Sequence, residues 1–187
     1  MTFDLHQIDP DDPRWTRRGA VYVPSGQGPT WWVSGDVYTT KADAAATNGS
    51  LSLIEASVPP GAGPVAHLHN ANDEAFYLLA GELEFLDGDH MFLAGPGDFI
   101  FVPRGTRHRF RNVGVHPARM LFMFTPAGLE RTFGVVGEPA RPGLPAPTGE
   151  VPPELLERLL AAAADIETDI MPEAADPADL RGRTPTS

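Results

Sequence analysis

Residues 61–81 read GAGPVAHLHNANDEAFYLLAG, and residues 97–112 read GDFIFVPRGTRHRFRN. Within a frame of glycine, proline and asparagine, these two stretches carry three histidines and one glutamate: His67, His69, Glu74 and His108. Neutral imidazoles and carboxylates are ligands for first-row transition metals. The two stretches therefore predict a site for one metal ion.

The spacing of these residues is compatible with strands that face a common interior. His67 and His69 are two residues apart, and alternate side chains of a strand share one face. Glu74 follows a polar turn, and His108 follows a second turn at Pro103–Thr106. Such a ligand set leaves room for a further ligand, which distinguishes a catalytic site from a closed structural one. Iron, nickel, copper, manganese and cobalt all accept these ligands, so the identity of the divalent metal stays open.

Short apolar segments alternate with turn residues along most of the chain. Those predicted as strands are Ala20–Val23, Trp31–Val33, Asp36–Thr40, Leu51–Val58, Val65–His69, Glu74–Leu79, Glu82–Leu86, His90–Leu93, Phe99–Val102, His108–Asn112 and Arg119–Thr125. Many short strands at this spacing favour an all-β sandwich or barrel.

The composition changes after this region, which predicts three segments. Residues 1–137 form the β-barrel domain with its N-terminal strands, and residues 138–153, with six prolines, form an extended linker. Residues 154–187 contain a C-terminal helix with a leucine stripe at helical spacing, followed by an acidic tail. We expect this tail to fray after Asp165.

Composition limits the function classes. The chain has 187 residues, a net charge of −11 and no cysteine. The acidic balance argues against nucleic acid and membrane surfaces as partners. The lack of cysteine excludes disulfides, thiolate nucleophiles and cysteine-bound zinc. No signal-peptide pattern and no membrane-length apolar run is present, so we expect a cytoplasmic protein.

Across Leu51–Thr125 the chain resembles the cupin superfamily. The residues that match its first motif are Gly61, His67, His69, Glu74 and Gly81, and those that match its second are Gly97, Pro103, Gly105, His108 and Asn112. The resemblance implies a jelly-roll β-barrel, here with a C-terminal helix. It also implies that His67, His69, Glu74 and His108 bind the metal.

A narrower resemblance is to single-domain cupins similar to quercetin dioxygenases, carried by residues 59–64, 74–81 and 125–130 and by the helical extension. It implies a dioxygenase that uses O₂ on a small phenolic, flavonol-like or polyketide-like substrate. Glu74 would then act as general base, provided that burial raises its pKa toward neutrality. One fold hosts many chemistries. Two alternatives therefore stay open: an isomerase, cyclase or decarboxylase with the metal as Lewis acid, and a non-enzymatic cupin that binds a small molecule.

Strand periodicity suggests which side chains line a substrate pocket. If Glu74 points inward, so do Phe76 and Leu78, and if His108 points inward, so does Phe110. Either Phe99 and Phe101 or the alternating pair Ile100 and Val102 join them. The competing interpretation is that these side chains form the barrel core. A local basic run, Arg104, Arg107, Arg109 and Arg111, is expected to be solvated.

The segment Met120–Phe124 has no polar alternation, which predicts that both faces of its strand are covered. A twofold homodimer through this sheet is the expected solution. The alternative is a monomer in which the helix and residues 20–40 cover the outer face.

Overall fold

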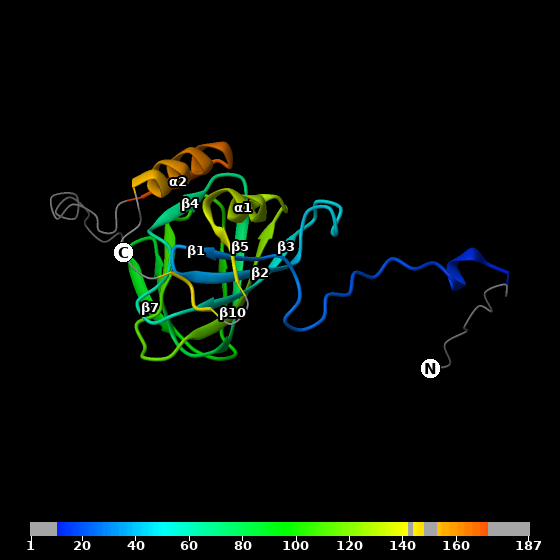
Figure 1. Cartoon of the computed structure of the whole chain (residues 1–187), viewed down its shortest axis with the longest axis horizontal. Coiled ribbons are helices and arrows are strands. Elements are labelled where there is room, and N and C mark those ends of the chain that lie inside the picture. The colour runs from blue at the N-terminus through cyan, green and yellow to red at the C-terminus, as the bar shows by residue number, and fades with distance from the viewer. Residues whose placement is uncertain (1–10, 142–143, 148–152, 172–187) are drawn as a thin grey trace, which may run out of the picture.

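The computed structural model describes residues 11–141, 144–147 and 153–171. Two antiparallel sheets form a jelly-roll barrel (Figure 1). The larger sheet contains, in spatial order, β11 (Glu138–Pro139), β1 (Thr30–Val33), β2 (Asp36–Ala42), β3 (Ser52–Val58), β10 (Ala118–Thr125), β5 (Asp73–Ala80) and β8 (Phe99–Val102). The smaller contains β12 (Thr168–Ile170), β4 (His67–His69), β9 (His108–Arg111), β6 (Leu83–Asp87) and β7 (His90–Ala94). The all-β fold is confirmed.

The core lies between the two sheets and follows strand alternation. In β10 the inward residues Met120, Phe122 and Phe124 are buried, whereas Leu121 and Met123 on the outer face are half-buried. Phe76 and Leu78 of β5 extend the same core. Each buried phenylalanine or leucine contributes about 1.5–3 kcal/mol relative to an exposed one. Packing of these alternating side chains therefore fixes the register that positions the site.

The described residues also form four helices outside the two sheets. They are the 3₁₀ helices η1 (Pro13–Trp15) and η2 (Leu129–Thr132) and the α-helices α1 (Phe133–Val136) and α2 (Pro153–Asp165). The expected C-terminal helix is α2, which lies with α1 beside the end of the barrel near β4 (Figure 1). The side chains of Leu155 and Leu156 in its predicted stripe are outside the described part. Among the described residues, no helix has the length and apolar character needed to cross a bilayer.

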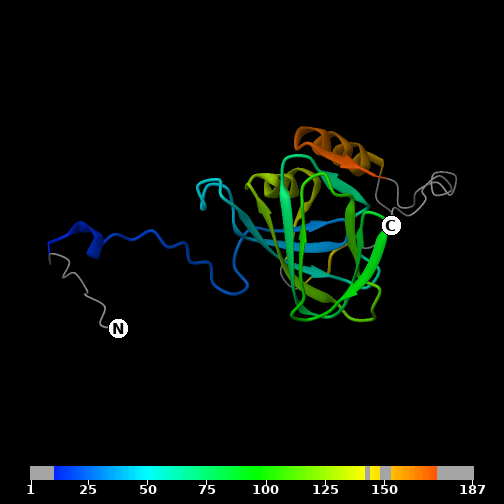
Figure 2. The same ribbon diagram turned by 180° about the vertical axis from the view of Figure 1, so that it is seen from behind.

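Two sequence predictions need correction near the N-terminus and at β4. Residues 20–23 form no strand; residues 11–23 run away from the barrel (Figure 2) and find no strand partner there. The strand predicted from Val65 begins at His67 instead. Gly63 just before it has φ +137°, and a Cβ there would lie 2.2 Å from the Phe110 carbonyl oxygen. This close backbone approach requires glycine and delays the start of the strand.

Two further strands lie where a linker and a fraying tail were expected. Within the predicted linker, β11 pairs with β1, and the rest of that segment is only partly described. The prediction of fraying directly after Asp165 is wrong, because β12 pairs with β4. The physical reason is that β4 offers a free edge, whose backbone groups β12 satisfies. Residues 172–187 of the predicted tail lie outside the described residues.

Candidate metal centre

The structure brings the four predicted ligands to one point inside the barrel. His67 and His69 lie on β4, Glu74 is the second residue of β5, and His108 is the first residue of β9. Direct pairing of His67 with His108 across β4 and β9 aligns two of the ligands. One ligand atom from each of the four residues lies within 4.8 Å of the others. This is a group that could hold a metal ion.

The ligand atoms face one another closely. Glu74 Oε2 lies 2.8 Å from His108 Nε2 and 3.3 Å from His69 Nε2. The three imidazole centroids are 4.5–5.4 Å apart. His69 Nε2 is buried and makes no well-formed hydrogen bond within the described residues. A buried polar atom without a partner is costly unless something else satisfies it, and a metal ion fits that requirement.

Each histidine is held through its other ring nitrogen. His67 Nδ1 lies 2.8 Å from the Val65 carbonyl oxygen, and His108 Nδ1 lies 2.9 Å from that of Thr106. Because a carbonyl only accepts hydrogen bonds, both Nδ1 atoms carry hydrogen. In a neutral ring this leaves the Nε2 lone pair for a metal, but in this structure His108 Nε2 lies 2.8 Å from Glu74 Oε2 and donates to it. These contacts fix the orientation of both rings.

Burial and neighbouring charges favour the metal-binding forms of His67 and Glu74 but not that of His108. Burial, assisted by the neighbouring imidazoles, lowers the pKa of His67 to about 3, so this ring is neutral near pH 7. Burial would raise the pKa of Glu74, but the nearby His108 and His69 rings outweigh burial and lower that pKa to about 2. For His108, burial opposes charging, but its contact with Glu74 raises the pKa. The supposition that burial raises the pKa of Glu74 toward neutrality is therefore wrong in this arrangement.

The second motif also contains a structural residue. Asn112 is 1 % exposed, and its Nδ2 donates to the carbonyl oxygens of Val58 and His116, both at 2.8 Å. Its Oδ1 accepts from the backbone N–H of Gly114 at 2.9 Å. The side chain thereby fixes the loop after β9 and has no direct contact with the ligands among these bonds.

The three residues predicted to line a pocket lie in the core. Phe76, Leu78 and Phe110 are all less than 5 % exposed, and the ring of Phe76 lies 6.4 Å from that of His108. Their role toward a substrate stays a prediction. On β8, Ile100 and Val102 face inward.

The basic run is not uniformly solvated. Arg109 faces away from the barrel interior, as expected, but it is 6 % exposed, and its Nη1 lies 3.0 Å from Glu84 Oε1. The sequence interpretation of Arg109 as solvated is therefore wrong. A carboxylate across the β6–β9 pair allows the guanidinium to be buried on the outer side of the sheet.

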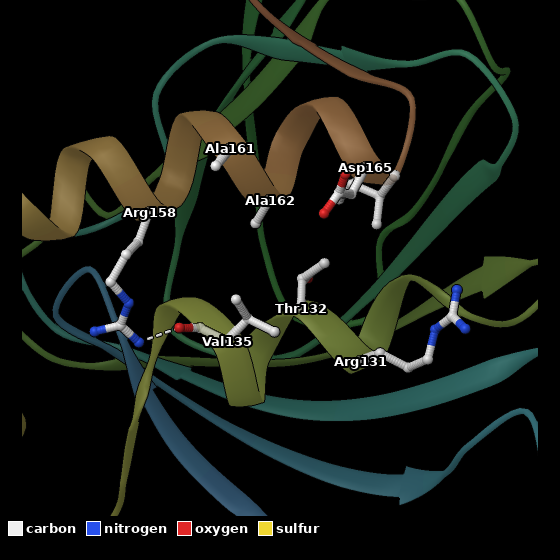
Figure 3. A pocket seen from close by; sticks show the side chains of 8 residues that line it. Arg131, Thr132, Val135, Arg158, Ala161, Ala162 and Asp165 are labelled. Carbon is white, nitrogen blue, oxygen red and sulfur yellow. Dashed lines mark hydrogen bonds between the residues drawn. The ribbon is translucent and has the colours of Figure 1, made fainter.

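Two cavities lie beside the C-terminal segment rather than over the ligands. The first, of about 290 Å³, lies between α2 on one side and η2 and α1 on the other (Figure 3). Its lining residues are Arg131, Thr132, Val135, Arg158, Ala161, Ala162, Asp165 and Ile166. The second, of about 220 Å³, is bounded by residues 71–72, 126–129, 131 and 165–167. Neither includes a predicted ligand or pocket residue.

The fold and the ligand group together define a protein class. Residues 54–124 match the family model described as a cupin domain. The chain belongs to the cupin superfamily.

Comparison with known proteins gives similarities at moderate identity. The chain is 32 % identical over 124 residues to quercetin 2,3-dioxygenase of Bacillus subtilis, covering 65 % of this chain and 36 % of that protein. It is 35 % identical over 98 residues to the tetracenomycin polyketide synthase protein TcmJ of Streptomyces glaucescens, covering 52 % and 64 %. The chain thus spans about a third and just under two thirds of the lengths of these curated relatives.

A solved structure supports the fold. The crystal structure of a predicted oxalate decarboxylase from Thermotoga maritima superposes with a TM-score of 0.54 at 21 % identity, covering 56 % of this chain and 98 % of that one. At this identity the likeness concerns the jelly-roll fold alone.

Proposed function

We propose that this chain is a metal-dependent oxidoreductase, a dioxygenase that acts with O₂ on small phenolic, flavonol-like or polyketide-like molecules. The observation that carries the proposal is that three imidazoles and one carboxylate converge at one point. Within this group, the buried His69 Nε2 lacks a hydrogen bond among the described residues. Similarity to a quercetin 2,3-dioxygenase supports the choice of reaction.

The chain's own residues would divide the work as follows. His67, His69 and His108 would hold the ion through Nε2, and Glu74 through its carboxylate. A divalent transition metal bound there would supply an open coordination position and redox or Lewis-acid chemistry. The rings of Phe124, 5.5 Å from His69, and Phe76 would exclude water around the ligands.

Glu74 would also accept the hydroxyl proton of the substrate. Its carboxylate is ionised at neutral pH, so it can take up a proton. Phenols and enols are more acidic than aliphatic alcohols, and we therefore expect them to be preferred as substrates.

A second candidate is a cyclase or related enzyme that needs no O₂. The similarity to the TcmJ protein, which is named for tetracenomycin polyketide synthesis, favours this alternative. In that case the metal acts as a Lewis acid and the same four residues hold it. A cupin that binds a small molecule without turnover uses the same fold and is the third outcome of the test.

The test combines metal analysis with oxygen consumption. Purified protein is analysed for metal, reconstituted with Fe²⁺, Ni²⁺, Cu²⁺, Mn²⁺ or Co²⁺, and assayed with flavonols and polyphenols in an oxygen electrode. O₂ uptake that depends on the metal supports the proposal. Turnover of a polyketide-like substrate without O₂ uptake establishes the second candidate, and binding without turnover establishes the third.

Matched variants show whether the four-residue group is responsible. His108→Ala should remove most of the bound metal and the activity, because it deletes a ligand. His116→Ala alters an exposed histidine outside the group and should change neither. Near-stoichiometric metal in a His67/His69/His108 triple alanine variant would overturn the proposed site.

A further inference from the structure

Among the described residues, His69 differs from His67 and His108 because its Nδ1 contacts a residue from a distant part of the chain. Its Nδ1 lies 2.8 Å from Thr168 Oγ1 on β12, 99 residues away in sequence. Both residues are buried, at 5 % and 8 % exposure. We propose that Thr168 is a positioning residue of the metal centre, so that the C-terminal strand β12 completes the site. The inference rests on the proposed metal-binding function.

The other two histidines need no such help. The oxygens that hold His67 and His108 come from residues two positions earlier in the same loop or strand. Any chain that folds these local segments supplies them. His69 depends instead on a segment outside the matched cupin domain, which ends at residue 124.

Several bonds place Thr168 opposite His69. The strand register pairs the two residues directly. On one side the Asn70 N–H donates to the Glu167 carbonyl oxygen, and on the other the Met171 N–H donates to that of Ala66, both at 2.8 Å. The side-chain amide of Asn70 also donates, through Nδ2, to Asp169 Oδ2 at 3.0 Å. The hydroxyl position is thus set by backbone pairing on both sides.

Helix α2 anchors this strand to the barrel. Ala162 is buried in the core cluster, and Leu159 and Ile166 pack against it. Figure 3 shows α2 lying along η2 and α1, with the Arg158 guanidinium donating to the Val135 carbonyl oxygen. The helix therefore serves to deliver β12 to the edge of β4.

We assign the buried His69 ring to one of its two tautomers, with the Thr168 hydroxyl as acceptor. Glu74 Oε2, 3.3 Å from His69 Nε2, would favour a hydrogen on Nε2, which blocks metal binding. With Thr168 Oγ1 as acceptor, the hydrogen sits on Nδ1 and the Nε2 lone pair faces the other ligands. Without the hydroxyl, the contact between Glu74 Oε2 and His69 Nε2 is the stronger of the two. The ring then favours the tautomer with hydrogen on Nε2, which does not bind the metal.

The test measures Co²⁺ binding by the full-length chain through competition with a chromophoric chelator, together with the visible spectrum of the bound ion. Thr168→Val keeps the shape and removes the hydroxyl, and we expect it to weaken Co²⁺ binding by about 10- to 100-fold. Thr168→Ser restores the hydroxyl and should recover wild-type binding and spectrum. Thr132→Val is the matched control, because it removes a buried hydroxyl that bonds to the Leu129 carbonyl oxygen, away from the ligands.

A second measurement needs no variant to fold. In metal-free wild-type protein, ¹⁵N shifts of the imidazoles report the tautomer of His69, and we expect hydrogen on Nδ1. Hydrogen on Nε2 overturns the inference, as does Thr168→Val that binds Co²⁺ like the wild type. If the wild-type protein binds none of the metals tested, the proposed function itself fails. If it binds metal and Thr168→Val binds it equally well, only the role of Thr168 fails, so the two failures can be told apart.

Discussion

The Asp73 carboxylate and the Arg104 guanidinium join the two turns that lead into Glu74 and His108. Asp73 Oδ2 lies 2.9 Å from Arg104 Nη2, and Oδ1 accepts from both the backbone N–H and Nε of Arg104, at 2.9 and 3.0 Å. Asp73 directly precedes Glu74, and Arg104 stands four residues before His108. The pair therefore links two predicted ligands that are far apart in sequence.

The first prediction concerns this pair. Arg104→Gln should weaken metal binding several-fold, because the guanidinium bonds between the two turns are lost and only the backbone N–H bond to Asp73 Oδ1 remains. Thermal stability near neutral pH should change little, since the pair is exposed. Competition titration with Co²⁺ and a melting curve measure the two effects. Arg14→Gln is the control, because Arg14 makes a similar bidentate pair with Asp12 outside the barrel. Equal metal affinity in wild type and Arg104→Gln would contradict the prediction.

The pair also has a defined pH window. Hydrogen bonds from Arg104 lower the pKa of Asp73 to about 2, below its ordinary value near 4. A group with a lowered folded-state pKa stabilises the fold above its unfolded pKa and loses that contribution as the pH falls through its folded pKa. The small difference in stability between wild type and Arg104→Gln at neutral pH should therefore disappear as the pH falls from about 4 to about 2.

The second prediction separates the two roles of Glu74. Glu74→Gln should cost more activity than metal, because an amide oxygen can still face the ion but cannot accept a proton. Metal content per chain and turnover with a phenolic substrate are measured on the same preparation. A variant that keeps both near wild-type values would show that the carboxylate is neither an essential ligand nor the base.

The third prediction concerns a carboxyl group that the metal centre does not use. Asp36 is fully buried; its Oδ2 accepts from the Tyr38 hydroxyl at 2.8 Å, and Oδ1 has no partner among the described residues. Burial raises the pKa of Asp36 to about 7. Between about pH 4 and pH 7 the unfolded chain releases this proton and the folded chain keeps it, so stability falls as the pH rises.

Asp36→Asn should remove this pH dependence. The wild-type free energy of unfolding should fall by up to about 1.4 kcal/mol per pH unit in that window, whereas the asparagine variant loses this contribution. Denaturant titrations of metal-free protein at several pH values measure the slope. Asp43→Asn, at an exposed carboxyl, serves as the control. A slope that is the same in wild type and Asp36→Asn would exclude Asp36 as its source.

The sequence predicts the barrel and the convergence of its ligands well because both depend on local patterns. Alternation of apolar residues and the two-residue spacing of His67 and His69 survive in any antiparallel sheet. Thr168 could not be predicted as a partner of His69, since no pattern links residues 99 positions apart. The burial of Arg109 could not be predicted for the same reason, because it depends on an ion pair with Glu84 on the neighbouring strand.

The last prediction is the homodimer, which the outer face of the larger sheet favours. Four large side chains on neighbouring strands, where Tyr77 pairs with Phe99, are 40–60 % exposed: Tyr77, Leu79, Phe99 and Phe101. Helix α2 packs on α1 and β12, and residues 20–23 point away, so the covering expected for a monomer is missing from the described segments. A second copy placed by a twofold axis buries the same face twice.

Light scattering at micromolar concentration should give about 40 kDa, twice the chain mass of 20.1 kDa. Phe101→Glu should dissociate the dimer because it places a charge in the apolar contact, and Val115→Glu, at an exposed turn, should not. A wild-type mass near 20.1 kDa would reject the dimer.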